Sequence, residues 1–137
     1  KAHPGQKLPP SFIIMDDLLG KMKVSTDVFN NLMSTYRHFN LTIFITSQYM
    51  VKNISTLLRE LTDVAFIFKT HFKNTRTSLY EAFGQRLDNQ EEFNQLLEEA
   101  TKEQHYCLVY QSNEEDINDA YTSFKAPSED KPFKLEM

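Results

Sequence analysis

The stretch Ser11-Phe-Ile-Ile-Met-Asp-Asp17 joins a short apolar run to two adjacent carboxylates. An unbroken apolar run is typical of a strand buried in the parallel sheet of an α/β domain, and such sheets bind ligands at the carboxyl ends of their strands. Because two like charges are costly to bury, we expect Asp16 and Asp17 to lie where the strand ends. Many nucleotide hydrolases place their magnesium-associated and water-polarising acids there, so the stretch indicates phosphate chemistry.

Strands and helices alternate outward from this stretch. Apolar runs rich in β-branched and aromatic residues predict strands at residues 12–15, 41–47, 64–69 and 105–111. Apolar residues at three- and four-residue spacing predict helices at residues 26–38, 75–83 and 89–102, with a short helix or turn at 53–60. We expect Gly84 to end one helix in the left-handed conformation, and Asn89 with Glu92 to cap the next. The alternation predicts an α/β fold, specifically a mostly parallel, three-layer α/β/α domain.

Composition divides the chain into three regions. Residues 1–10 are polar and contain three prolines, which predicts an exposed connector. Residues 11–111 carry the alternating strands and helices and form the predicted domain. Residues 112–137 are acidic and contain proline, so we expect a tail that is mobile or docked on a partner.

Charge and cysteine content narrow the class of protein. A formal charge of −4 over 137 residues provides no general basic field, so any contact with DNA must be local or shared among subunits. The single cysteine, Cys107, excludes an internal disulfide and is expected to be a buried, inert thiol in a reducing compartment. The apolar runs are too short to span a bilayer, which predicts a soluble, intracellular protein without a membrane span.

Asp16 and Asp17 fit two different roles if a nucleotide binds at the strand end. Asp16 would hold magnesium, usually through a water, and Asp17 would orient and polarise the water that attacks the γ-phosphate. Neighbouring residues on a strand point to opposite faces, so the two acids can share a site only because the strand ends there. The alternative is that Asp16 caps a turn and Asp17 is a solvated surface acid.

A second stretch, Tyr36-Arg-His-Phe-Asn-Leu-Thr-Ile-Phe-Ile-Thr-Ser-Gln48, runs from a helix end into an apolar strand tipped by an amide. If this strand lies beside the acid strand, Gln48 reaches the same sheet edge and can hydrogen-bond a phosphate oxygen or the attacking water. Glutamine is also common in turns, and Arg37 near a helix carboxyl end is favoured by the helix dipole alone.

The order of these motifs resembles the genome-packaging ATPases of large double-stranded DNA viruses and related mobile elements, in the FtsK/HerA superfamily of P-loop motors. The resemblance covers about residues 11–111. The matching stretches are Ile13-Ile-Met-Asp-Asp17, Arg37-His-x-Asn40 leading into residues 43–48, Leu58-Arg-Glu-Leu61 followed by residues 64–68, and Glu92-Phe93 through Ala100-Thr101 into residues 106–110.

The resemblance implies a role for each candidate residue. Asp16 corresponds to the Walker B acid that binds Mg²⁺ with ATP, and Asp17 to the catalytic acid, which is often glutamate in the wider superfamily. Arg37 falls where the family presents an arginine finger to the neighbouring subunit's nucleotide, and such a group contributes about 10³ or more in rate. Gln48 matches the sensor. Arg59 is a candidate second phosphate-sensing or interface arginine, with an ordinary surface-helix position as the alternative.

The resemblance also implies a biological setting. It predicts part of a P-loop NTPase (RecA-like) core within an ATP-driven motor that moves viral double-stranded DNA into a capsid. The expected partners are further copies in a homo-oligomeric ring, double-stranded DNA and capsid or portal-type viral proteins. The expected location is the viral assembly site in the host cell cytoplasm, or the virion.

One departure from the family pattern limits the activity expected of this chain. No Gly-x-x-x-x-Gly-Lys-Ser/Thr sequence is present, and Gly5-Gln-Lys-Leu8 lacks both the spacing and the hydroxyl residue. Such a loop supplies backbone donors, a lysine and a magnesium-binding hydroxyl, which Asp16 and Asp17 cannot replace. We therefore expect either the carboxyl-terminal part of a longer ATPase, whose loop lies upstream, or a derivative without a nucleotide site. Alone, the chain should hydrolyse little or no ATP.

Two other functions remain open. A magnesium-dependent nuclease would gather Asp16, Asp17 and Lys21 around the metal and would cleave DNA without ATP. A non-catalytic assembly module would keep the fold and bind only proteins.

A basic patch stands apart from these motifs. Its basic members are Lys69, His71, Lys73 and Arg76, with Phe68 and Phe72 interleaved. It could contact a DNA backbone, or it could be a solvated helix start.

Overall fold

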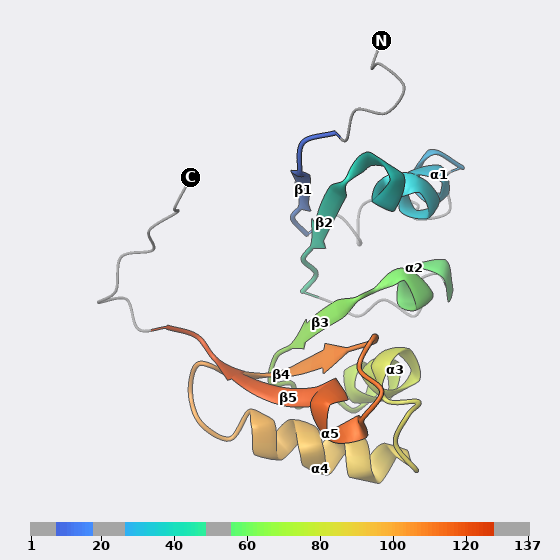
Figure 1. Ribbon diagram of the computed structural model, residues 1–137. Helices are drawn as coiled ribbons and strands as arrows, with labels where there is room; N and C mark the ends of the chain where they lie inside the picture. Colours follow the sequence, from blue (N-terminus) through green and yellow to red (C-terminus); the bar gives the residue numbers. More distant parts are fainter. Residues whose placement is uncertain (1–7, 18–26, 49–55, 128–137) are drawn as a thin grey trace. The chain divides into compact units, whose positions relative to one another are not determined.

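The computed structural model describes residues 8–17, 27–48 and 56–127, which belong to two compact units, Lys1–Thr62 and Asp63–Met137. Both units combine strands with helices, so the predicted α/β class is confirmed (Figure 1). The elements of the first unit are β1 (Ser11–Met15), α1 (Asp27–Thr35), η1 (Tyr36–Phe39), β2 (Leu41–Ile45) and α2 (Thr56–Leu61). The elements of the second unit are β3 (Val64–Ile67), α3 (Lys73–Phe83), α4 (Gln90–Ala100), β4 (Tyr106–Gln111), α5 (Ile117–Ala120) and β5 (Tyr121–Lys125).

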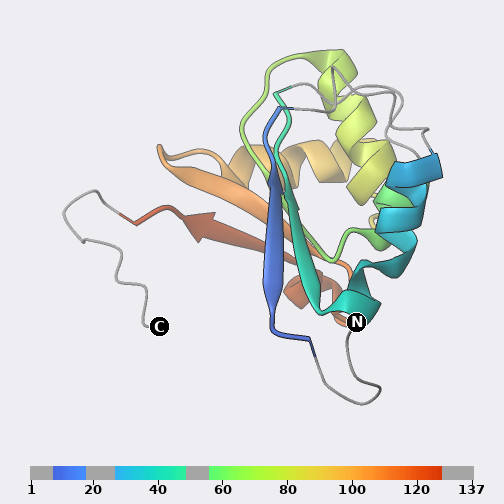
Figure 2. The ribbon, with the colours of Figure 1, turned by 90° about the horizontal axis from the view of Figure 1, so that it is seen from above.

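In the first unit β1 and β2 form a parallel pair, with Ser11 opposite Leu41 and Met15 opposite Ile45 (Figure 2). The backbone pairing continues one step past the strands, because Thr46 N–H donates to the Met15 carbonyl at 3.0 Å. The parallel arrangement predicted for these two runs is therefore confirmed. Their carboxyl ends lie together at one edge of the sheet.

Alternate residues of this sheet face a small core. Phe29, Met33 and Leu58 are buried at its centre. Partly buried apolar side chains pack against them from the sheet and from α2; these are Met15, Ile43, Ile45 and Leu61. The opposite face carries Phe12, Ile14 and Phe44, which are exposed. The unbroken apolar runs of β1 and β2 predict a sheet that is covered on both faces. Among the described residues of this unit, helix side chains pack on one face only.

The turn into β2 explains how the helical segment stops. The predicted helix at 26–38 is observed as α1 followed by the tighter 3₁₀ turn η1. Asn40 then adopts the left-handed conformation with φ 50°, and its N–H bonds the carbonyls of Tyr36 and Arg37. Asparagine tolerates this backbone better than most residues, so it ends the helical segment and starts the strand.

The second unit differs from the expected topology. Its strands run in the order β3-β4-β5, and both pairings are antiparallel. The expectation of a mostly parallel sheet is therefore not confirmed, since apolar runs report burial and not strand direction. Here α3 and α4 pack on each other and return the chain to the end where β3 stops. Residues 112–120 are then too few for a parallel crossover, which takes about a dozen or more residues.

The strand β5 and the short helix α5 fall within residues 112–137, the region expected to be a tail. Tyr121 is buried and Ala120 is fully buried, so this segment is part of the second unit's structure. Its sequence is acidic up to Asp119, and within β5 Tyr121 is buried while residues 122–125 are exposed.

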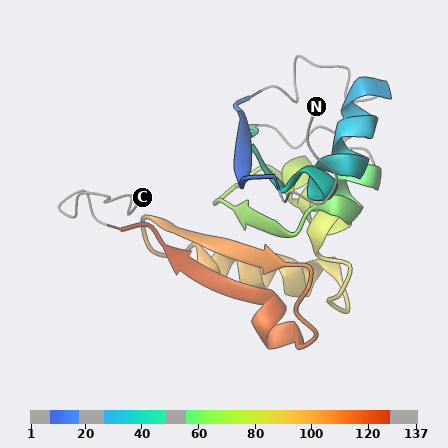
Figure 3. The ribbon, with the colours of Figure 1, turned by 45° about the horizontal axis from the view of Figure 1, so that its top comes forward.

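Helix α4 runs along one face of the antiparallel sheet (Figures 1 and 3). Phe93 and Leu97 from α4 and Leu108 from β4 are the largest fully buried side chains. The predicted helix start is confirmed, because the Asn89 side chain accepts from Glu92 N–H at 2.9 Å. Among the residues that the structure describes, helices cover one sheet face within each unit, so the expected three-layer arrangement is not seen inside either one.

The prediction for Gly84 is wrong. Its φ is −100°, outside the left-handed region, although its N–H does close α3 on the Tyr80 carbonyl at 2.8 Å. Glycine is needed here for close packing, since a Cβ atom at this position would lie 2.5 Å from Tyr80 Cδ2 and 3.0 Å from Phe93 Cδ2.

None of the helices in the described ranges is both long and apolar enough to cross a bilayer.

Candidate active site

Polar residues follow the ends of both parallel strands in the first unit. Asp16 and Asp17 come directly after β1, and Thr46 and Gln48 come after β2. Because the strands are parallel, both chain exits lie at the same sheet edge. The prediction that the two acids sit at a strand exit agrees with this geometry.

Thr46 joins the two acids. Its hydroxyl donates a hydrogen bond to Asp16 Oδ1, and its Oγ1 accepts from the Asp17 N–H at 3.1 Å. The same N–H also lies 3.2 Å from the Thr46 carbonyl oxygen. One threonine thus orients the first carboxylate and anchors the backbone that carries the second. Sequence analysis assigned Thr46 no role, although extending the β1–β2 register by one residue places it opposite Asp16.

Asp17 has a left-handed backbone, with φ 49°. This conformation is uncommon outside glycine but is tolerated by aspartate and asparagine. It turns the chain away from the strand path, so the alternation of side chains between the two faces stops here. Asp16 is exposed and Asp17 is half-buried, so the two carboxylates have different surroundings, as two separate roles require.

Gln48 is exposed two residues beyond Thr46. No hydrogen bond between its side chain and Asp16 or Asp17 is present in the described ranges. The sheet therefore brings the amide to the correct edge, and the structure leaves its role as a sensor untested.

Arg37 lies at the other end of the same sheet, on η1 before β2 begins. Five-residue strands at about 3.3 Å per residue separate it from the acids by roughly 17 Å along the sheet. Its Nε donates to the Tyr36 hydroxyl at 2.9 Å, and its guanidinium carbon lies 5.5 Å from the centre of the Tyr36 ring. Arg37 is thus held in place, at the opposite end of the sheet from Asp16 and Asp17.

Arg59 belongs to α2 and is half-buried. Its Nε is buried and has no hydrogen-bond partner within the described part of the chain. A buried guanidinium nitrogen without a partner is costly, so this atom is a candidate to receive an acceptor from another molecule or chain segment. The structure does not place Arg59 with Asp16.

The oxygen ligands of this edge fit Mg²⁺ in part. Nucleotide-bound Mg²⁺ uses one or two carboxylates together with phosphate oxygens and waters. Asp16, oriented by Thr46, can supply one such carboxylate, and Asp17 lies next to it. Within the ranges that the structure describes, no cluster of three or more His, Cys, Asp or Glu side chains could hold a metal without further ligands. The edge therefore suits a metal that arrives with phosphate.

A separate hollow of about 490 Å³ lies in the second unit between α4 and the β4–β5 pair. Glu99, Glu103 and Lys102 are among the residues that line it, and it includes none of the candidate site residues. Its two carboxylates make it a poor site for an anionic nucleotide.

No protein-family model matches this chain, and no curated protein sequence does so either. Solved structures do match it, and viral genome-packaging NTPases are among them. The genome packaging NTPase B204 from Sulfolobus turreted icosahedral virus 2 in complex with ATP-γS superposes with a TM-score of 0.62 at 18% identity, over 87% of this chain and 53% of that chain. Its complex with AMPPCP gives the same score and identity over 88% and 54%.

The DNA-packaging ATPase B204 from Sulfolobus turreted icosahedral virus also matches, with a TM-score of 0.62 at 16% identity, over 87% of this chain and 53% of that chain. The family resemblance stated from the motifs is thus confirmed at the level of the fold. The chain spans about half the length of these structures.

Proposed function

We propose that this chain is the part of an ATP-driven motor that carries the Walker B acid, catalytic acid, sensor and arginine finger, and that the motor packages viral double-stranded DNA. The observation that carries the proposal is the Asp16–Thr46–Asp17 arrangement at the carboxyl edge of a parallel strand pair. The fold likeness to genome-packaging NTPases supports it. Polypeptide outside these 137 residues would supply the phosphate-binding loop and extend β1 and β2 into a larger parallel sheet.

Each residue has a defined task in this proposal. Asp16 would hold Mg²⁺, usually through a water, with a carboxylate that the Thr46 hydroxyl keeps in one orientation. Asp17 orients the attacking water and polarises it by accepting its proton in a hydrogen bond. Gln48 hydrogen-bonds that water or a phosphate oxygen. Bound Mg²⁺ would neutralise charge on the β- and γ-phosphates.

Arg37 acts on a different nucleotide from the one beside Asp16. Because it lies at the far end of the sheet from its own acids, it would stabilise the charge on a nucleotide held by a neighbouring copy in a ring. Arg59 is a second candidate for an interface or phosphate contact, because its Nε has no hydrogen-bond partner among the residues that the structure describes. The partners of this proposal are DNA, further copies and capsid or portal-type proteins, in the host cell cytoplasm or the virion.

Asp17→Asn in a protein that includes the phosphate-binding loop tests the central claim. We expect ATP binding and oligomerisation to persist while turnover falls by about 10²-fold or more, because proton transfer to a positioned base is lost. Single-turnover ATP hydrolysis and nucleotide-binding titrations measure the two effects. Asp88→Asn, an exposed aspartate before α4, is the control.

Wild-type turnover by Asp17→Asn would remove Asp17 from the mechanism and contradict the central claim. Magnesium-dependent DNA cleavage without ATP, lost in Asp16→Ala, would support the nuclease function instead.

A further inference from the structure

We propose that residues 68–73, here called the basic–aromatic loop, form a contact surface for a nucleic acid. The loop leaves the end of β3 and enters α3 in the second unit. It joins two phenylalanines, two lysines and a histidine within six positions. None of these side chains belongs to the proposed ATP site.

The two phenylalanines of the loop are the most exposed large apolar side chains in the described ranges. Phe72 is 77% exposed and Phe68 is 69% exposed. A phenylalanine gains about 1.5–3 kcal/mol from full burial, so leaving two in water within a few residues is unfavourable for folding alone. An exposed apolar cluster of this kind marks an interaction site.

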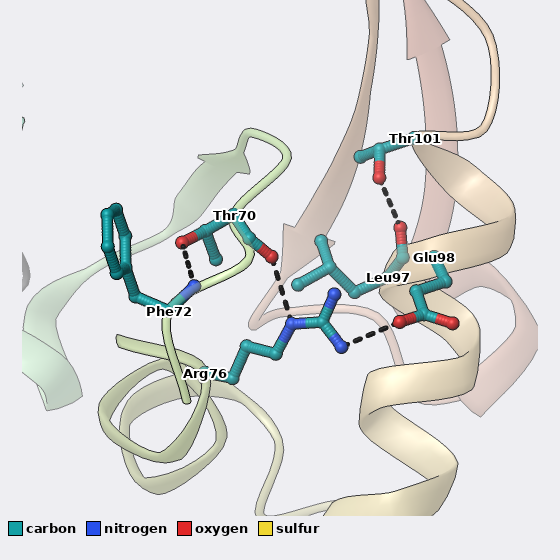
Figure 4. A network of polar contacts seen from close by, with 6 residues as sticks. All are labelled: Thr70, Phe72, Arg76, Leu97, Glu98 and Thr101. Atoms are coloured by element: carbon teal, nitrogen blue, oxygen red, sulfur yellow. Dashed lines mark hydrogen bonds and ion pairs between the residues drawn. The ribbon is translucent and has the colours of Figure 1, made fainter. Parts of the chain in front are cut away.

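The loop is held in one conformation by Arg76 (Figure 4). Arg76 Nε donates to the Thr70 carbonyl at 2.9 Å, and its Nη1 lies 2.7 Å from Glu98 Oε1 on α4. Arg76 N–H bonds the Phe72 carbonyl at 3.0 Å, while Phe72 N–H approaches the Thr70 hydroxyl at 3.4 Å. These bonds tie the loop backbone to two helices.

Because the loop backbone is fixed by these hydrogen bonds, the directions of its side chains are fixed as well. Phe72 points away from Arg76 and α4 in Figure 4. Because the backbone is already fixed, a partner would bind the aromatic rings with little further ordering of the loop.

The charge of the loop favours a nucleic acid over an apolar protein surface. Lys69, His71 and Lys73 are all exposed, and residues 64–80 contain no carboxylate in a chain with net charge −4. Glu98 of α4, which approaches this region, is already bonded to Arg76. Lysines can neutralise phosphates, and exposed aromatic rings can stack on bases.

Another lysine, Lys125, lies at the same end of this sheet. Tyr106 begins β4 beside the end of β3, and it is paired in register with Lys125 of β5. Lys125 Nζ sits 5.4 Å from the centre of the Tyr106 ring. The basic surface therefore extends from the loop onto the adjacent strands.

The inference rests on the proposed motor function only for the identity of the polymer as DNA. A surface with two exposed rings favours strands whose bases are accessible, whereas lysine contacts alone serve duplex and single strands alike. Comparing an oligothymidylate with a duplex of the same length separates the two contributions.

Fluorescence anisotropy with these two DNA probes, over a series of salt concentrations, tests the inference on the purified chain. Lys69→Ala with Lys73→Ala should weaken binding to both probes and reduce the slope of log K against log salt by about 1.4 on the single strand, since each phosphate contact contributes roughly 0.7. Phe68→Ala with Phe72→Ala should weaken binding to the single strand by about tenfold or more.

Matched controls separate surface effects from folding. Lys102→Ala removes an exposed lysine of the second unit, and Phe39→Ala removes an exposed phenylalanine of the first unit. Both should bind DNA as the wild type does. Thermal unfolding should show the loop variants to be as stable as the parent, or slightly more stable.

Unchanged DNA binding by the loop variants would overturn this inference and leave the ATP-site proposal intact. Loss of self-association in the Phe68→Ala, Phe72→Ala variant with DNA binding retained, measured by sedimentation, would show a protein-docking surface and would also overturn it. A wild-type chain that binds neither probe at low salt would count against both the loop and the DNA partner of the proposed motor.

Discussion

Thr46 shows how one side chain can organise two acids. Its hydroxyl donates to the Asp16 carboxylate and its oxygen accepts from the Asp17 backbone, so both acids depend on a single threonine. Groups that orient a metal-binding carboxylate commonly affect metal affinity or activity by about 10–100-fold when removed. Thr46 is therefore a positioning residue in the proposed mechanism.

Thr46→Val, made in a protein that includes the phosphate-binding loop, should lower turnover by about 10–100-fold and raise the Mg²⁺ concentration needed for half-maximal activity. The valine keeps the shape of the side chain and removes the hydroxyl. Steady-state ATPase assays over a Mg²⁺ series measure both effects. Thr46→Ser should restore most of the activity, and a serine variant as impaired as the valine variant would show that the hydroxyl is not what matters.

Cys107 illustrates a residue whose prediction could be checked directly. It is buried at 3% exposure, as expected from its place in an apolar run. Burial raises the pKa of its thiol above the ordinary value. Both facts agree with a thiol that packs in the core of the second unit.

At the scale of single elements, the end of α3 depends on the absence of a side chain. Gly84→Ala should lower the free energy of unfolding by about 1–3 kcal/mol, because the added Cβ would press on Tyr80 and Phe93. Denaturant unfolding followed by circular dichroism measures the change. Glu81→Ala, exposed on the same helix, should be nearly neutral, and equal stability of both variants would contradict the packing argument.

The strand β5 makes the second unit sensitive to alkaline pH. Burial, assisted by the nearby Tyr110, raises the pKa of Tyr121 from 10 to about 12. Its hydroxyl donates to the Phe83 carbonyl at 2.6 Å. The folded state therefore holds this proton more tightly than the unfolded state does.

The higher pKa of Tyr121 in the folded state contributes to the free energy of unfolding. This contribution is fully present below about pH 10 and is lost as the pH rises toward 12. We expect the melting temperature to fall in that window, and Tyr121→Phe to show a shallower fall. The variant should start about 1 kcal/mol less stable at neutral pH, since it loses the bond to Phe83. Parallel slopes for both proteins between pH 10 and 12 would refute the assignment.

Sequence patterns located most elements but not the direction of the later strands. The apolar runs at β1 to β4 and the Asn89 cap were visible because burial and capping leave local signals. The antiparallel course of β4 depends on how α3 packs on α4, which no local pattern records. β5 was missed because acidic residues precede it and it contains neither an apolar run nor a regular alternation; of its five residues only Tyr121 is buried.

The candidate site was predictable to a similar extent. The acids at the end of β1 follow from an apolar run that stops at two charges. The role of Thr46 needs the register between β1 and β2, and the separation of Arg37 from the acids needs their parallel direction. Both are tertiary facts, so the sequence could nominate these positions without showing which of them meet.

At the scale of the whole molecule, the position of Arg37 predicts catalysis across subunits. Arg37→Ala and Asp17→Asn, each made in a protein that includes the phosphate-binding loop, should be inactive alone. When the two variants are mixed, part of the wild-type ATPase rate should return. A mixed ring would place an intact Arg37 beside an intact Asp17 at some boundaries. A stopped-flow or coupled ATPase assay over mixing ratios measures the recovery.

The control for this experiment mixes Asp17→Asn with Asp16→Ala. Both variants lack a working acid pair, so the ATPase rate of this mixture should not exceed the rates of the two variants alone. A mixture of Arg37→Ala and Asp17→Asn that stays inactive, in rings shown by native mass spectrometry to contain both chains, would place Arg37 outside the reaction.

The backbone at Asp17 limits which acid can occupy that position. The backbone conformation at this position, with φ at 49°, favours aspartate and asparagine. Glutamate would adopt it at a cost in conformational free energy of order 1 kcal/mol. Asparagine shares the tolerance of aspartate, so Asp17→Asn removes charge while keeping the chain path. Exchanging Asp17 for glutamate would therefore strain the strand exit as well as lengthen the carboxylate, so the left-handed turn itself favours a short acid at this edge.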